Sequence, residues 1–288
     1  MSILNKDDRA FWDENGYVVI HEAVPPENIK ATADAVWGFL GAQPDDPKSW
    51  YPDPPRAGIG VRMHQHQVLW NNRQCPRVHQ AFSEIWGTEK LWVSFDQCSI
   101  SPPLRTPPND GGNMNGDAST KAPIPLHWDT PLDLPIPFCV QGVLYLTDTE
   151  EDMGAFTCVP GFHLKLEAWL ESLPSDTDPR KQDLMGLGAK PIPGKAGDLI
   201  IWHHLLPHGA GKNTADQPRV VQYISMFPAQ EEDEDFVNYR IDAWKNRFAG
   251  GGHSGTMVEL EKGKEYENGQ SAELTPLGRK LLGLDLWG

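Results

Sequence analysis

Length, composition and charge describe an ordinary globular chain and exclude two classes of partner. The 288 residues are 39% hydrophobic and 23% charged, which is enough to bury a substantial core. A formal net charge of −15 argues against nucleic acid and anionic membranes as partners, because both require clustered Lys and Arg.

The first part of the chain, to about residue 90, is predicted to be mainly helical with one short strand. Residues 5–16 begin with acidic side chains and end at Asn-Gly, a typical helix C-terminus. The β-prone run YVVI at 17–20 follows, and a second helix restarts after the proline pair at 25–26. Residues 43–58, rich in Pro and Asp, are predicted to form a loop.

The central part, about residues 90–230, is predicted to be a β core. Its short β-prone runs are LWVSFDQCSI, FCVQGVLYLT, AFTCVPG, DLIIWHHL and RVVQYISMF, with one helical insert at 164–173. Such a series favours an antiparallel sandwich or barrel over a doubly wound sheet. The acidic segment 230–269 is predicted to be exposed or mobile, and SAELTPLGRKLLGLDLW near the end to be helical. We expect one domain over residues 1–288, with a C-terminal tail and helix at about 231–288.

The cellular compartment is predicted from three absent features: a secretory signal, a membrane span and paired cysteines. The N-terminus has no basic segment leading into an apolar run, so no secretory signal is expected. No stretch approaches the roughly 18 apolar residues of a membrane span. The four cysteines form no CxxC pair and are expected to be reduced. These features favour the cytoplasm.

Two motifs carry the chemistry. In PLHWDTPL, His127 and Asp129 are two residues apart; on a strand both would face one side and offer mixed N and O ligands to Fe(II), Mn(II) or Zn(II). The strand-like run DLIIWHHLLPH ends at His208. Two histidines and a carboxylate on neighbouring strands form the facial triad of non-haem Fe(II) oxygenases, which leaves three positions for 2-oxoglutarate and dioxygen. Arg219, eleven residues after His208, can bind the distant carboxylate of 2-oxoglutarate bidentately.

These motifs resemble the phytanoyl-CoA dioxygenase family of Fe(II)/2-oxoglutarate-dependent oxygenases. The resemblance extends over HWD, HGAGKN and the following arginine, and over FWDENGYVVI, VPGFH and LTPLGRKLLGLD. It implies a double-stranded β-helix, a jelly-roll or cupin-like barrel with flanking helices. It further implies iron ligation by His127, Asp129 and His208, and a salt bridge from Arg219 to 2-oxoglutarate.

Two positions qualify the resemblance. Many relatives carry a hydroxyl residue where this chain has Ala210, so one hydrogen bond to the cosubstrate is missing or supplied elsewhere. Related halogenases replace the carboxylate ligand by a small residue, and the presence of Asp129 argues against halogenation.

Further residues are weaker candidates. Gln141 and Tyr145 share one face of a predicted strand. This polar face either lines a water-filled pocket or is exposed to solvent. The resemblance to the family favours contacts of both residues with the cosubstrate. His203 is expected to be a supporting or packing residue and His204 a structural one. Arg62, His64 and His66 form either a substrate-pocket wall or an ordinary polar strand. Residues 102–125 are interpreted as a lid or specificity loop, with Trp128 and Asp133 near its mouth.

The predicted function is that of an Fe(II)- and 2-oxoglutarate-dependent dioxygenase that hydroxylates an unactivated C–H bond and releases succinate and CO2. Two alternatives stay open: a cupin-like metal enzyme that does not use 2-oxoglutarate, and a catalytically silent binding module. The partner is a small molecule, and the negative charge and the aromatics near the mouth favour a partly apolar one over an acyl-CoA. Its identity, the choice between hydroxylation and desaturation or cyclisation, and the choice between monomer and homodimer stay open.

Overall fold

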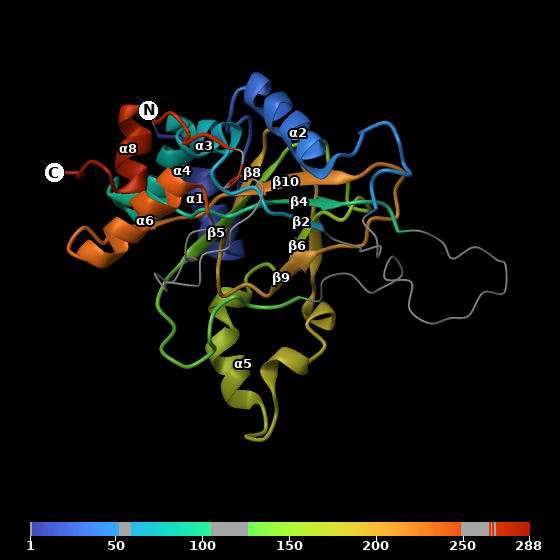
Figure 1. Cartoon of the computed structure of the whole chain (residues 1–288). Coiled ribbons are helices and arrows are strands. Elements are labelled where there is room, and N and C mark those ends of the chain that lie inside the picture. The colour runs from blue at the N-terminus through green and yellow to red at the C-terminus, as the bar shows by residue number, and fades with distance from the viewer. Residues whose placement is uncertain (1, 52–58, 105–125, 249–264, 266, 268) are drawn as a thin grey trace.

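A six-stranded antiparallel sheet forms the centre of the molecule (Figure 1). The structure is a computed structural model that describes residues 2–51, 59–104, 126–248, 265, 267 and 269–288. The strand order of the large sheet is β1-β8-β5-β10-β4-β2. Its strands are β1 (Tyr17–Ile20), β2 (Ile59–Val61), β4 (Cys98–Ser101), β5 (Val140–Tyr145), β8 (Leu199–His203) and β10 (Arg219–Tyr223).

A smaller antiparallel sheet packs against one face of the large one. It has the order β7-β6-β9, and its strands are β7 (Lys190–Ile192), β6 (Phe156–Cys158) and β9 (His208–Ala210). His127 extends this sheet by one bridge to His208, with backbone N–H···O distances of 2.9 and 3.0 Å. A separate ribbon pairs β3 (Leu91–Val93) with β11 (Met226–Pro228). The predicted antiparallel β core is confirmed.

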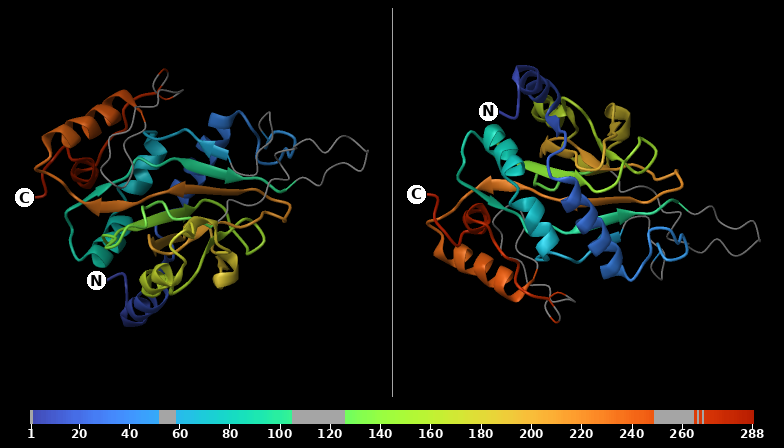
Figure 2. Two further views of the ribbon diagram at one scale, coloured as in Figure 1. Left: turned by 90° about the horizontal axis from the view of Figure 1, so that it is seen from below. Right: turned by 90° about the horizontal axis from the view of Figure 1, so that it is seen from above.

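Helices cover the other face of the large sheet. α2 (Pro26–Leu40), α3 (Gln67–Arg73) and α4 (Pro76–Trp86) lie on one side of it, and α5 (Leu166–Ser172) lies on the side of the small sheet (Figure 1). The remaining helices are α1 (Lys6–Asn15), α6 (Glu234–Asn246) and α8 (Pro276–Leu282). Both chain ends lie at the end of the molecule where α6 and α8 pack (Figure 2). No helix in the described part of the chain is long and apolar enough to cross a membrane.

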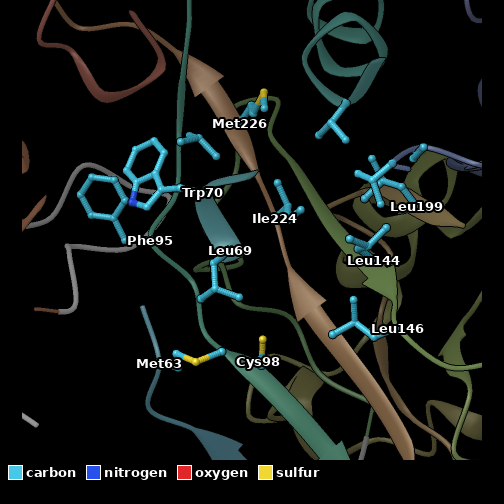
Figure 3. Packing of buried hydrophobic residues seen from close by; sticks show 14 of the residues in the cluster. Met63, Leu69, Trp70, Phe95, Cys98, Leu144, Leu146, Leu199, Ile224 and Met226 are labelled. Atoms are coloured by element: carbon cyan, nitrogen blue, oxygen red, sulfur yellow. The ribbon is translucent and has the colours of Figure 1, made fainter. Parts of the chain in front are cut away.

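Strand alternation divides the apolar residues between two cores. On β5, Val140 and Leu144 pack toward the helices, whereas Val143 and Tyr145 pack between the two sheets. Figure 3 shows Leu144 in the first of these cores, together with side chains from the helical layer and the neighbouring strands. A cavity opens on the inner side of the large sheet, between the two sheets.

The four cysteines are free thiols, as expected. Cys98 and Cys158 are buried, and burial raises the pKa of each thiol to about 12. Neither is therefore a nucleophile at neutral pH.

The prediction of an exposed, mobile segment over residues 230–269 is wrong for residues 234–246. These residues form α6, which Asp233 caps and which buries Phe236 and Arg240. The Arg240 guanidinium donates hydrogen bonds to the backbone carbonyls of Val93, Leu281 and Leu282. Acidic composition concealed an apolar face at helical spacing. Residues 249–264, 266 and 268 lie outside the described residues.

Glu84 on α4 ties the N-terminal residues to the helical layer. Its carboxylate accepts hydrogen bonds from the Ser2 hydroxyl at 2.6 Å and from the amides of Ile3 and Leu4 at 2.7 and 3.0 Å. Burial by itself would raise the pKa of Glu84, but the hydrogen bonds to the ionised form outweigh it and lower the pKa to about 2.

We expect Glu84→Gln to destabilise the fold at pH 7 by about 1 kcal/mol, the net value of a typical hydrogen bond. A lowered carboxyl pKa stabilises the fold above the unfolded-state value, and this contribution is lost as pH falls toward the folded value of about 2. The difference between wild type and variant should therefore shrink below about pH 4. Thermal unfolding at pH 7 and pH 3 measures it, with Glu171→Gln on α5 as an exposed control. An equal difference at both pH values contradicts the assignment.

Candidate functional site

Three side chains predicted to bind a metal converge at one point beside the small sheet. Ligand atoms of His127, Asp129 and His208 all lie within 4.8 Å of one another. The Nε2 atoms of the two histidines lie 3.4 Å and 3.3 Å from the two carboxylate oxygens of Asp129. Two imidazole nitrogens and one carboxylate oxygen suit a borderline divalent ion such as Fe(II), Mn(II) or Zn(II). The donor set therefore fits the metal that the resemblance implies.

Backbone pairing explains why the two histidines meet. His127 and His208 are directly opposite each other in the bridge, so their side chains project to the same side, with ring centroids 4.9 Å apart. The prediction that His127 and Asp129 lie on a regular strand is wrong. Only His127 makes a bridge, and the chain bends at Asp129, two residues before a proline. The bend turns the carboxylate toward both imidazoles.

The polar surroundings favour the ionised carboxylate and a fixed ring orientation. Hydrogen bonds from His127 and His208 hold the pKa of Asp129 well below its usual range, against the opposing effect of burial. His208 Nδ1 donates to the carbonyl of Leu206 at 3.0 Å, which leaves Nε2 to face the carboxylate.

Two further side chains hold Asp129 in place. Gln141 Nε2 donates to Asp129 Oδ2 at 2.8 Å. Arg180 donates to the backbone carbonyls of Trp128 and Thr130, on either side of Asp129, at 2.6 Å each. Sequence reasoning missed Arg180, because it lies about fifty residues from the motif, in a short 3-10 helix (Pro179–Lys181), and has no motif of its own.

A cavity of about 310 Å³ opens beside the three candidate ligands. Arg219 lies in its wall with only 2% of its surface exposed, and its Nη2 donates to Ser101 Oγ at 3.2 Å. Among the described residues no carboxylate pairs with Arg219, and its Nε has no hydrogen-bond partner. A buried cation without a counter-ion at a cavity wall is a suitable site for an anionic ligand.

The two residues predicted to contact the cosubstrate from β5 have different positions. Gln141 lines the cavity, whereas Tyr145 is fully buried and is not among its lining residues, so the cosubstrate contact of Tyr145 stays a prediction. The Tyr145 hydroxyl donates to the Ile192 carbonyl at 2.7 Å and accepts from the Phe156 amide at 2.9 Å. Its hydrogen-bonding capacity is thus taken up by the small sheet.

Tyr223 lines the cavity instead, and sequence reasoning missed it. A signal was available, since Tyr223 is four residues after Arg219 on β10 and therefore on the same strand face. Ala210 also lines the cavity, as do Gln97 and Ser225. The cavity therefore contains other polar residues, although residue 210 has no hydroxyl group.

The residues predicted to form the substrate pocket do not line this cavity. Trp128 is buried away from it, with Nε1 donating to the Leu205 carbonyl at 2.8 Å and its ring packed near Phe162 and Trp169. Its ring packs in the core between the sheets and α5, so a substrate contact of Trp128 stays a prediction without support from this cavity. Asp133 is exposed on the loop that follows.

The polar segment before α3 serves the fold rather than the cavity. The His64 ring hydrogen-bonds to the Phe95 carbonyl through Nδ1 at 2.9 Å, and burial lowers its pKa. The His66 side chain caps α3 by accepting from the Val68 amide, and Arg62 is exposed. None of these three residues lines the cavity beside the triad, and the substrate wall stays a prediction. Of the predicted lid, residues 105–125 lie outside the described residues.

The other two histidines of the HHLLPH run do not join the three candidate ligands. The His203 ring packs against Phe138 and His163, and burial, followed by the neighbouring His163 and His204, lowers the pKa of His203 to about 3. His204 is buried. Only His208 points toward Asp129, at 3.3 Å.

Comparison with known proteins supports the fold and the family. The sequence profile of the phytanoyl-CoA dioxygenase family matches residues 12–221. A Dictyostelium discoideum protein named "Putative phytanoyl-CoA dioxygenase" is 24% identical over 259 residues, which cover 76% of this chain and 74% of that protein.

Solved structures share the fold at low sequence identity. A hypothetical protein from Escherichia coli superposes with a TM-score of 0.68 at 15% identity, covering 98% of this chain and 82% of that one. The epimerase SnoN, solved with Fe3+, α-ketoglutarate and nogalamycin RO, gives a TM-score of 0.52 at 18% identity, covering 78% and 83%. The predicted jelly-roll fold is confirmed. The chain belongs to the phytanoyl-CoA dioxygenase family, whose members are iron- and 2-oxoglutarate-dependent enzymes.

Proposed function

We propose that this protein is an Fe(II)- and 2-oxoglutarate-dependent dioxygenase that hydroxylates an unactivated C–H bond of a small molecule. One observation carries the proposal. The ligand atoms of His127, Asp129 and His208 lie within 4.8 Å of one another, at a cavity whose wall contains the buried Arg219. A metal-binding set and an anion-binding cation in one cavity are what a 2-oxo acid chelate with a distant carboxylate requires.

Each residue has a role that follows from its contacts. His127, Asp129 and His208 would hold the iron, which supplies the activation of dioxygen when bound. Arg219 would bind the distant carboxylate of 2-oxoglutarate through its planar guanidinium. In the reaction, 2-oxoglutarate loses CO2 and takes one oxygen atom of dioxygen to become succinate. The other oxygen atom enters the substrate C–H bond as a hydroxyl group.

The aromatic wall beside His208 would keep water from the reacting atoms. The Trp202 ring lies 5.0 Å and the Phe156 ring 6.2 Å from the His208 ring, centroid to centroid. Both rings line the cavity and are almost fully buried. Exclusion of water strengthens the electrostatic contacts of a bound anion and limits side reactions.

The test is iron-dependent succinate formation by the full-length protein supplied with Fe(II), 2-oxoglutarate and candidate substrates. We expect some succinate without substrate and more with a true substrate, whose product gains one oxygen atom by mass spectrometry. Product isomerised or desaturated without oxygen gain would replace hydroxylation by another reaction of the same class. Iron binding without any succinate formation would favour the cupin-like enzyme or the silent module.

We further propose that residues 1–288 form a single domain and act as a monomer or homodimer. The larger apolar core contains residues from the N-terminal helices, the central strands and α8, so all three parts of the chain share it. Size-exclusion chromatography with light scattering measures the oligomeric state, and limited proteolysis tests the single domain.

Arg180→Ala is expected to lower the affinity for iron about tenfold, because residues that orient metal ligands typically contribute 10- to 100-fold. Arg180 donates hydrogen bonds to the carbonyls on either side of Asp129. Without them the bend at Asp129 becomes more mobile, and its carboxylate is held less firmly beside the two histidines. Titration with Fe(II) or Mn(II) measures the affinity. The control is Lys181→Ala, a neighbouring exposed cation that pairs with Asp178. Equal metal affinities for both variants would show that Arg180 does not position the metal ligands.

A further inference from the structure

A second cavity, of about 650 Å³, adjoins the candidate metal site. Of the described residues, it shares only Asp129 and Gln141 with the cavity that Arg219 lines. A molecule bound there would thus lie beside the carboxylate ligand but separate from the proposed cosubstrate position. Its volume is within the range of about 300–1,000 Å³ that is usual for small-molecule sites.

Aromatic side chains from three separate segments form its walls. Trp86 ends α4, Phe138 precedes β5, and Phe227 lies on β11. The rings of Trp86 and Phe138 meet edge to face, with centroids 4.8 Å apart. Trp86 Nε1 donates to the Met226 carbonyl at 2.8 Å, so the indole is held in one orientation. Phe138 is 43% exposed, so part of its surface is accessible to a bound molecule.

The remaining lining restricts the shape and charge of an occupant. Pro131, Pro137 and Pro228 also line the cavity, and their fixed φ angles limit backbone adjustment. Among the described lining residues there is no Lys or Arg; Asp129 supplies a carboxylate and His204 an imidazole. With the chain at a net charge of −15, nothing here neutralises phosphate or sulfate groups. A coenzyme A thioester, with several phosphate charges, is poorly matched to this surface.

We propose that this cavity binds an uncharged, ring-containing apolar substrate against Trp86 and Phe138. A ring-containing ligand would gain the most binding free energy from aromatic walls, because an aromatic pair contributes about 0.5–1.5 kcal/mol beyond the burial of its apolar area. As a statement about substrate, this inference rests on the proposed function. The binding itself is independent of turnover and is tested without it.

The test compares two fluorescent probes with the same ring skeleton. N-phenyl-1-naphthylamine is neutral, and 8-anilinonaphthalene-1-sulfonate adds one sulfonate. We expect the neutral probe to bind the metal-free full-length protein at least about tenfold more tightly, because the described lining residues offer no Lys or Arg to the sulfonate. Phe138→Ala should weaken the neutral probe about tenfold, which corresponds to losing one good aromatic contact and its buried area. Ala229→Trp, which fills the cavity from another segment, should weaken it as well.

Phe11→Ala is the matched control. Phe11 is 41% exposed, nearly the same as Phe138, and lies on α1 in an edge-to-face contact with Tyr17. We expect it to bind both probes like the wild type. Equal affinity for the two probes, unchanged binding in Phe138→Ala and Ala229→Trp, or displacement of the neutral probe by free coenzyme A would each overturn the proposal. Because no turnover is measured, a protein that forms no succinate can still support or overturn it.

Discussion

His208→Ala is expected to lower iron-dependent succinate formation more than about 100-fold, since even the partners of metal ligands contribute 10- to 100-fold. The substitution removes the imidazole whose Nε2 lies 3.3 Å from Asp129 and leaves two of the three candidate ligands. Iron content after gel filtration should fall in parallel with activity. Wild-type turnover by His208→Ala with iron present would show that the triad assignment is wrong.

The control for this variant lies in the same short run of sequence. His203 is a histidine five residues earlier whose ring packs against Phe138 and His163 and does not contact the candidate ligands. His203→Ala should therefore retain the iron stoichiometry of the wild type, although loss of its packing lowers the melting temperature. Loss of iron from both variants at temperatures where both are folded would contradict a specific role for His208.

Arg219→Ala is expected to raise the KM for 2-oxoglutarate roughly 30-fold or more. Truncating one partner of a buried charge pair costs about 2 kcal/mol or more, and each 1.36 kcal/mol is a factor of ten. Arg219 would contact the end of 2-oxoglutarate that does not react, so KM should change much more than kcat. Initial rates over a range of 2-oxoglutarate concentrations measure this separation.

Arg219→Lys and the iron affinity of each variant serve as controls for Arg219→Ala. Arg219→Lys keeps the charge but loses the planar fork, so its KM should fall between those of wild type and Arg219→Ala. Iron affinity without cosubstrate should be the same in all three proteins, because Arg219 does not contact the candidate ligands. If Arg219→Ala leaves catalysis of a true substrate unchanged, the cupin-like alternative that does not use 2-oxoglutarate is favoured.

The contrast between Tyr145 and Tyr223 shows where sequence reasoning stops. Both occupy inward positions on adjacent strands, and Tyr145 is paired in register with Val221, two residues before Tyr223. The sequence assigns both to the same side of the sheet. Only the distance to the small sheet distinguishes them, since Tyr145 reaches Ile192 and hydrogen-bonds there. Tyr223 meets open space instead.

By itself the sequence determined the antiparallel β core, and it predicted the candidate metal ligands and the arginine beside them. Ligand chemistry and the resemblance of the two motifs to the family led to the ligands and the arginine, and the short β-prone runs led to the core. The strand expected through His127 and Asp129 is not formed. Only the tertiary structure decided which other side chains line the cavities. It buried Trp128, brought Arg180 to the bend at Asp129, and gathered Trp86 and Phe138 around a second cavity. A cavity is the volume that side chains from distant segments leave unfilled, and no local pattern encodes that volume.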